Sequence, residues 1–302
     1  MIVDNITDYL KEVKGITDKW FIKADPWFRG ENISHNPTRY QEPLLPKVFQ
    51  ERYKDRENEM IQMFRMKANN YGNVPEFSRT DLWLFLMQHC GLPTRLLDWT
   101  EGSLIALFFA INRFEEGDIP IVWVLNPLIL NFLSFSSFEF NLTWKGYKAK
   151  HPVSIGNISA AFTLGQDKYQ SDFPIAIYPH SIHPRISAQR GCFTVHGKCH
   201  ESLDKILKNL NINSIMKSIQ VNKLEESAKR FNFNNYYEVV SQLKKSFSTT
   251  DCLYRIDINT NETEKGDMLH ELKTMGVSYE TLFPDLDGLA QDIKLIKNNN
   301  SY

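Results

Sequence analysis

The sequence predicts an α+β fold, with a mixed and largely antiparallel sheet as its core and a cluster of helices in the N-terminal half. Three observations lead to this prediction. Apolar residues recur at helical spacing in the first half, strand-like runs dominate the second half, and the two kinds of element do not alternate strictly. With 302 residues, 42% of them hydrophobic, the chain can bury a core as one large domain.

The N-terminal residues predict a short helix that ends near Gly15. Between residues 19 and 31, aromatic and charged side chains mix in a pattern typical of two short strands interrupted by Pro26. Arg29-Gly30-Glu31 closes the second of these strands.

A helical subdomain is predicted over residues 57–115. Its first helix covers residues 57–71, and its second begins near Ser78 or Thr80. The second helix stops at Cys90, because Gly91 favours the left-handed cap and Pro93 cannot continue a helix. An exposed turn at residues 98–101 leads to a third helix over residues 102–114.

The rest of the chain is predicted to be rich in strands. Apolar runs bounded by Pro, Gly or Asn predict strands at 119–125, 174–178, 192–196 and 253–258. Residues 131–165 predict an irregular connection, residues 203–250 a helical insertion, and residues 267–276 a further helix.

The composition and the N-terminal residues indicate which binding partners and which cellular compartment to expect. Lys and Arg number 35 against 36 Asp and Glu, so the net charge of −1 predicts no overall attraction to nucleic acid or to a membrane. The four cysteines are too sparse for a disulfide framework, the first 15 residues do not resemble a secretory signal, and the apolar run 104–114 is too short to cross a bilayer. We therefore expect a cytoplasmic protein.

Residues 88–100 form the most unusual segment, Gln-His-Cys-Gly-Leu-Pro-Thr-Arg-Leu-Leu-Asp-Trp-Thr. It places an imidazole, a guanidinium, a carboxylate and hydroxyl groups around a helix end that glycine and proline hold rigid. Arg95 and Asp98 are spaced to form an ion pair, and Asp98 or Thr100 can cap the helix that starts near Gly102. A purely structural role and a functional role both fit this pattern.

Several other chemistries are not supported by the sequence. No zinc site is predicted from Cys192, His196, Cys199 and His200, because their spacing lacks a Cys-x-x-Cys knuckle. His89 and Cys90 are neighbours on one helix and point about 100° apart, so they cannot act as a nucleophilic pair. No glycine-rich phosphate loop or dinucleotide fingerprint occurs.

The chain resembles the FRG domain of bacterial proteins, which is named for a Phe-Arg-Gly triplet. The resemblance rests on residues 27–31 (Trp-Phe-Arg-Gly-Glu) and on residues 88–100, and residues 185–193 and 281–290 extend it. It implies a single FRG domain over residues 1–302. Cys90 departs from the family pattern, which more often has an aromatic residue at this position.

The same triplet, at the end of an early strand, is also similar to the first motif of ADP-ribosyltransferases. This similarity implies an ADP-ribosyltransferase-like sheet and NAD as the substrate. In such enzymes the arginine grips the ribose and phosphates of NAD, and a guanidinium suits phosphate oxygens because it is planar and permanently charged. The cofactor-binding residues that it implies are Arg29, Gly30, His89, Thr94 and Arg95.

Two catalytic residues follow from that similarity. Gln189 would face the cleft, and Glu280 would supply the carboxylate that stabilises an oxocarbenium-like transition state, with Glu271 as a second candidate. The residues also allow structural roles. Arg29 can pair with Glu31 or Asp98, and Gln189 can bracket the main chain.

Two functions therefore remain open. One is an enzyme that cleaves the nicotinamide–ribose bond of NAD and transfers ADP-ribose to a protein or nucleic acid, as a toxin or effector of phage defence that a neighbouring protein neutralises. The alternative is a non-catalytic sensor in which Arg29, His89 and Arg95 recognise a phosphate-bearing ligand or a phage protein. A carboxylate in the same cleft as Arg29 and Gln189 would favour the enzyme.

Overall fold

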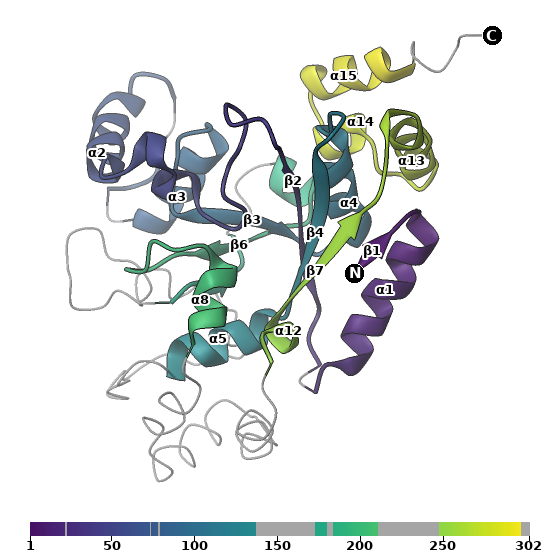
Figure 1. Ribbon diagram of the computed structural model, residues 1–302. Helices are drawn as coiled ribbons and strands as arrows, with labels where there is room; N and C mark the ends of the chain where they lie inside the picture. The colour runs from purple at the N-terminus through teal and green to yellow at the C-terminus, as the bar shows by residue number, and fades with distance from the viewer. Residues whose placement is uncertain are drawn as a thin grey trace.

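In a computed structural model of the protein, the described residues are 1–21, 23–72, 74–77, 79–136, 173–179, 184–210 and 248–296. Within these ranges, seven strands form one sheet in the order β1-β7-β4-β2-β3-β6-β5 (Figure 1). The strands are β1 (Ile2–Val3), β2 (Trp27–Ile33), β3 (Leu96–Thr100), β4 (Ile119–Leu125), β5 (Ile175–Ile177), β6 (Gly191–Val195) and β7 (Leu253–Ile258).

Five of the six neighbouring strand pairs are antiparallel, and only β1 and β7, at one edge, run parallel. This confirms the predicted mixed and largely antiparallel sheet. The sheet is open, because β1 and β5 lie at its two ends.

One face of the sheet is covered by two groups of helices. Over β2, β4 and β7 pack α1 (Ile6–Lys19), α4 (Ser103–Asn112), α13 (Glu262–Thr274) and α14 (Tyr279–Leu282). Over β3, β5 and β6 pack α2 (Glu57–Ala68) and α3 (Thr80–His89). Both groups lie on the same face, because Phe28 and Thr100 face each other across β2 and β3 and side chains alternate along each strand.

The opposite face is covered by α5 (Pro127–Ser136), α8 (Leu203–Asn209) and α12 (Thr249–Cys252). Figure 1 shows α1 and α13 on one side of the sheet and α5 and α8 on the other. The remaining elements are η1 (Lys47–Phe49), η2 (Glu51–Tyr53), α7 (Pro184–Ala188) and α15 (Leu286–Ile296). Tryptophans are prominent in the core of this face, where Trp27, Trp99 and Trp123 are all buried.

Several predicted elements are confirmed. The strands at 119–125 and 253–258 have the predicted bounds, and α3 ends at His89 with Cys90 as its C-cap. Gly91 has a φ of 80°, the left-handed conformation that its position predicted. The helix predicted over 267–276 begins earlier, at Glu262.

Three predictions near the N-terminus were wrong. Helix α1 continues past Gly15 to Lys19, because burying Ile16 and Trp20 outweighs the cost of about 1 kcal/mol for glycine within a helix. Residues 19–31 contain one strand rather than two, and Arg29-Gly30-Glu31 lies in the middle of β2.

The predicted exposed turn at 98–101 is mostly strand β3. Of its five residues only Asp98 is exposed, because the others pack between sheet neighbours and helices. This strand separates α3 from α4, so the predicted subdomain 57–115 contributes to the sheet as well as to the helices. An irregular connection was predicted over residues 131–165, but residues 131–136 belong to α5. In the helical insertion predicted over residues 203–250, residues 203–209 form α8. Residues 137–165 and 211–247 lie outside the described residues.

Among the described residues, no helix combines the length and the apolar character that crossing a membrane requires.

Candidate functional site

The first two sequence motifs meet where β2 and β3 separate. The strands share one facing pair, Phe28 and Thr100. Next to this pair, Arg29 Nη1 donates a hydrogen bond to the main-chain carbonyl of Asp98 at 2.7 Å, and Arg29 Nε donates to the Glu31 carboxylate at 2.8 Å. The guanidinium thus satisfies a carbonyl of β3 that the sheet ladder leaves open at this point.

Glu31 is itself held from two other directions. Its carboxylate accepts hydrogen bonds from Trp123 Nε1 at 2.9 Å and from the main-chain N–H of Leu44 at 3.2 Å. The Asp98 carboxylate lies 3.9 Å from Arg29 Nη1. One guanidinium beside two carboxylates leaves this cluster with a net negative charge, which disfavours a diphosphate as its ligand.

Gly30 lies beneath α4 on the other face of the sheet. A Cβ atom at this position would lie 1.9 Å from the Ala106 carbonyl oxygen and 2.6 Å from the Ala110 nitrogen. Only glycine therefore lets α4 approach β2 so closely. The backbone that approaches Gly30 is the protein's own helix.

Gln88 connects the end of α3 to β3. Its Nε2 donates to the Asp98 carboxylate at 2.9 Å, and its Oε1 accepts a hydrogen bond from the Thr94 hydroxyl at 2.5 Å. The Thr94 hydroxyl also accepts from the main-chain N–H of Leu96 at 3.1 Å. Arg29, Gly30 and Thr94 are thus brought into one region, in which Arg29 and Thr94 are linked through Asp98 and Gln88.

Arg95 does not join this region. It forms an ion pair with Glu57 on α2, with Nε and Nη2 each donating to one carboxylate oxygen, and Nη1 donates to the carbonyls of His196 and Gly197. The predicted ion pair between Arg95 and Asp98 is therefore wrong, because Arg95 is buried on the side of α2 whereas Asp98 is exposed beside α3. Arg95 fastens α2 to the sheet.

His196 is completely buried next to Arg95. Neither ring nitrogen has a hydrogen bond of good geometry among the described residues. Burial, together with the positive charge of Arg95 and the neighbouring His200, lowers the pKa of His196 to about 3, although the main chain of Glu201 acts in the opposite direction. The imidazole is therefore neutral in the folded protein at physiological pH.

The third and fourth sequence motifs contact each other. Arg185 Nε donates to the Asp285 carboxylate at 2.8 Å, and Gln189 Nε2 donates to the carbonyl of Leu282 at 3.1 Å. The Thr100 hydroxyl donates to the Gln189 carbonyl at 2.7 Å. Gln189 thus links the end of β3 to the end of α14, which is the structural role that the sequence allowed for it.

Gln189 and Arg29 do not converge on one hollow. Gln189 reaches Leu282 in the core beneath α14, whereas Arg29 leaves β2 on the opposite face, together with Trp27 and Glu31. Glu280 is exposed in the first turn of α14.

The other predicted residues are also separate from Arg29. Glu271 is exposed on α13, and His89 is half-buried at the end of α3. No contact between Arg29 and Gln189, Glu280 or His89 is present among the described residues.

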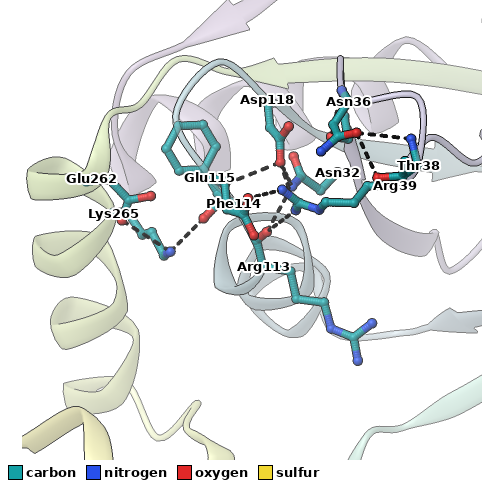
Figure 2. A network of polar contacts seen from close by, with 11 residues as sticks. Asn32, Asn36, Thr38, Arg39, Arg113, Phe114, Glu115, Asp118, Glu262 and Lys265 are labelled. Carbon is teal, nitrogen blue, oxygen red and sulfur yellow. Dashed lines mark hydrogen bonds and ion pairs between the residues drawn. The ribbon is translucent and has the colours of Figure 1, made fainter.

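A polar network holds the far end of β2 (Figure 2). Asn32 Nδ2 and Arg39 Nη2 each donate to the Asp118 carboxylate and to the Arg113 carbonyl, and Arg39 also pairs with Glu115. Burial of Asp118 favours its neutral form, but hydrogen bonds from Ser34, Asn32 and the Glu115 N–H, together with the charge of Arg39, lower its pKa overall.

This network ties the loop after β2 to the turn between α4 and β4. Lys265 of α13 joins the same turn by donating to the Phe114 carbonyl at 2.7 Å. In Figure 2 the Arg113 side chain points away from the network. These contacts fix the C-terminal end of β2, the strand that carries Arg29.

An open apolar groove of about 380 Å³ runs along α2. We call it the α2 groove. Its lining residues are Arg56, Met60, Met63, Phe64, Lys67, Ala68, Tyr71 and Leu92. Helix α2 buries Ile61 against the core, whereas Met63 is 43% and Tyr71 is 89% exposed. The groove thus combines flexible apolar side chains with two basic ones.

Within the described part of the chain, no group of three or more His, Cys, Asp or Glu side chains is arranged to hold a metal ion. The four cysteines are free thiols, and burial raises the pKa of Cys192 and Cys252.

The architecture is thus an open, largely antiparallel sheet with helices on both faces, in which an interior strand carries Phe28-Arg29-Gly30. Residues 25–118 match the family model of the FRG domain, which confirms the resemblance carried by residues 27–31 and 88–100, and this segment of the chain is therefore an FRG domain. Residues 185–193 and 281–290 lie outside the matched segment. No curated protein and no solved structure matches the chain. The α2 groove lies within the matched segment.

Sequence reasoning missed the α2 groove. The spacing of Met60, Met63, Phe64 and Tyr71 predicted a helix over residues 57–71, and α2 is present but ends at Ala68, before Tyr71. Several methionines beside lysine and arginine were the available signal, because methionine is common on surfaces that bind varied partners.

Proposed function

We propose that the protein is a non-catalytic binding module that takes a segment of a protein partner into the α2 groove. The observation that carries this proposal is the groove itself, an apolar hollow within the FRG domain that the fold leaves open to solvent. Concave apolar surfaces with a few polar groups are the usual form of a binding site.

The arrangement of the residues expected to carry ADP-ribose transfer gives less support to a transferase than to a binding module. Arg29 is already paired with Glu31 and is close to Asp98, so the cluster carries a net negative charge. The side-chain amide of Gln189 donates a hydrogen bond to the main-chain carbonyl of Leu282, and Glu280 is exposed on α14. A transferase would need these groups to converge on NAD, because its catalysis depends on preorganised charges.

The chemistry of the groove suggests the kind of partner. Met60, Met63 and Phe64 can accept apolar side chains, and methionine adapts to their shape. Positive charge along the same groove comes from Lys67 and from Arg56, which also pairs with Glu59 in an exposed ion pair. We infer that the partner presents an amphipathic helix with apolar residues at i, i+3 and i+4 and acidic residues at their flanks.

A displayed library of random peptides, selected on the purified full chain, tests this proposal. We expect the selected peptides to carry apolar residues at helical spacing together with Asp or Glu. Met63→Glu should weaken their binding at least tenfold, because it places a carboxylate inside the groove. Met66→Glu is the matched control, since Met66 is on the same helix and 71% exposed but does not line the groove.

Peptides that bind Met63→Glu as tightly as the wild type would contradict the proposed groove. A parallel assay measures release of nicotinamide from NAD, with protein and nucleic acid acceptors present, and we expect none above the rate without protein. Glu280→Gln is a surface change that should leave the fold intact. If the wild type releases nicotinamide and Glu280→Gln does not, the result would favour the transferase over the binding module.

A further inference from the structure

Helix α15 is attached to the rest of the molecule by its small and polar residues. Gly288 packs so closely on Phe283 that a Cβ atom at Gly288 would lie 2.0 Å from the Phe283 carbonyl oxygen. Asp292 is buried and accepts a hydrogen bond from Lys273 of α13 at 2.5 Å. Asp285 caps the helix by accepting from the Gly288 N–H at 2.9 Å.

The apolar stripe of α15 faces solvent instead. Leu286, Leu289 and Ile293 are 83%, 38% and 51% exposed. Their spacing of three and then four residues places them on one face of the helix. Figure 1 shows α15 at the margin of the molecule, beside α14 and away from the sheet. An amphipathic helix ordinarily turns its apolar face toward the core, so this orientation points to an external partner.

We propose that the partner is a second copy of this chain, and that the two copies of α15 pair in antiparallel orientation about a two-fold axis near residue 291. In this arrangement Leu289 of one copy lies against Ile293 of the other. A spacing of three and four residues is that of a coiled-coil seam, and a two-fold axis makes one stripe complementary to itself.

Charge favours this arrangement. Asp287 and Lys294 are seven residues apart and both exposed, so they lie on the same flank of the stripe. Antiparallel pairing places Asp287 of each copy beside Lys294 of the other, whereas parallel pairing places like charges at equal heights. A membrane surface fits less well, because the helix carries two aspartates and one lysine, whereas membrane-surface helices are rich in basic residues.

Sedimentation equilibrium of the full chain tests the proposal. We expect a monomer–dimer equilibrium for the wild type at tens of micromolar protein, and Ile293→Lys should weaken association at least tenfold. Gln291→Lys is the matched control, because Gln291 is exposed on the same helix but outside the stripe. Circular dichroism verifies that each variant stays folded.

A charge exchange distinguishes a second copy from any other occupant. Asp287→Lys alone should weaken the dimer, and Asp287→Lys combined with Lys294→Asp should restore it, since each copy then presents the exchanged pair. A wild type that stays monomeric up to several hundred micromolar overturns the proposal. A dimer that Ile293→Lys leaves unchanged, or binding to phosphatidylcholine–phosphatidylglycerol vesicles that Ile293→Lys abolishes, overturns it as well.

Discussion

Each residue of the Phe28-Arg29-Gly30 triplet has a structural role in this protein. Phe28 belongs to the core beneath α4, Arg29 joins β2 to β3, and Gly30 lets α4 approach the strand. The triplet is therefore explained by the packing of a helix on a splayed pair of strands, without a ligand.

Gly30→Ala tests this explanation. We expect a loss of about 3 kcal/mol or more in the free energy of unfolding, because the added methyl group would overlap the α4 main chain, which cannot move as a flexible side chain can. Denaturant unfolding followed by circular dichroism measures the change.

Gly15→Ala is the control for Gly30→Ala. A Cβ atom at Gly15 meets nothing within 4 Å, and the residue lies within α1. We expect this variant to gain roughly 0.4–1 kcal/mol, because alanine restricts the unfolded chain and favours helix. Equal effects of the two substitutions would argue against close packing at Gly30.

At the scale of single elements, one buried ion pair joins α2 to the sheet, in addition to the packing of Ile61 in the core. The side chains of Arg95 and Glu57 are 7% and 15% exposed, and Arg95 also ties α2 to the residues that follow β6. This contact helps to hold the α2 groove in place relative to the sheet.

We expect Arg95→Met to lower the free energy of unfolding by about 3 kcal/mol or more, because it leaves the Glu57 carboxylate buried without a cation. Adding Glu57→Met should recover part of this loss, since the unpaired charge is then removed. Thermal unfolding of the three proteins measures both effects.

Arg56→Ala provides the comparison for Arg95→Met. Arg56 and Glu59 form an ion pair in which both side chains are more than half exposed. We expect a change within about 0.5 kcal/mol, because water screens such pairs. A loss as large as that of Arg95→Met would show that burial does not set the energy of these pairs.

The elements that could be predicted from the sequence are those with strong local signals. Strands β4 and β7 are continuous apolar or alternating runs, and the end of α3 is marked by Gly91 and Pro93. Strand β3 was missed, because five residues that include an aspartate resemble a turn until the neighbouring strand β6 is known.

The candidate site could be predicted only in part. Glu31 and Asp98 were among the expected partners of Arg29, because one is two residues away and the other lies in the second motif. The partners of Arg95 and Gln189 are Glu57 and the Leu282 carbonyl, 38 and 93 residues distant, and no local pattern identifies contacts formed by tertiary folding.

At the scale of the whole molecule, the buried His196 makes stability depend on pH. Its pKa is about 3 in the folded protein, against an ordinary value of 6.5. Below pH 6.5 the unfolded chain binds a proton that the folded protein does not, so the free energy of unfolding falls as the pH falls. Above pH 6.5 this contribution is constant.

Between pH 6.5 and pH 5 we expect the wild type to lose roughly 2 kcal/mol more than His196→Phe, at about 1.4 kcal/mol for each pH unit. Denaturant unfolding at several pH values measures the two slopes. His270→Phe is the matched control, because it removes an exposed imidazole instead of a buried one, and we expect it to keep the wild-type slope. Parallel curves for wild type and His196→Phe would contradict the prediction.

Because β1 pairs with β7, strand β1 can join the sheet only late in synthesis of the chain. Ile2 and Val3 lie opposite Asp257 and Ile258, so the first strand must wait until more than 250 further residues have left the ribosome. Until then β4 also lacks its neighbour β7, and an unpaired edge invites association with other nascent chains. Strand β1 therefore enters the sheet only after β7, the last of its strands in chain order, has been made.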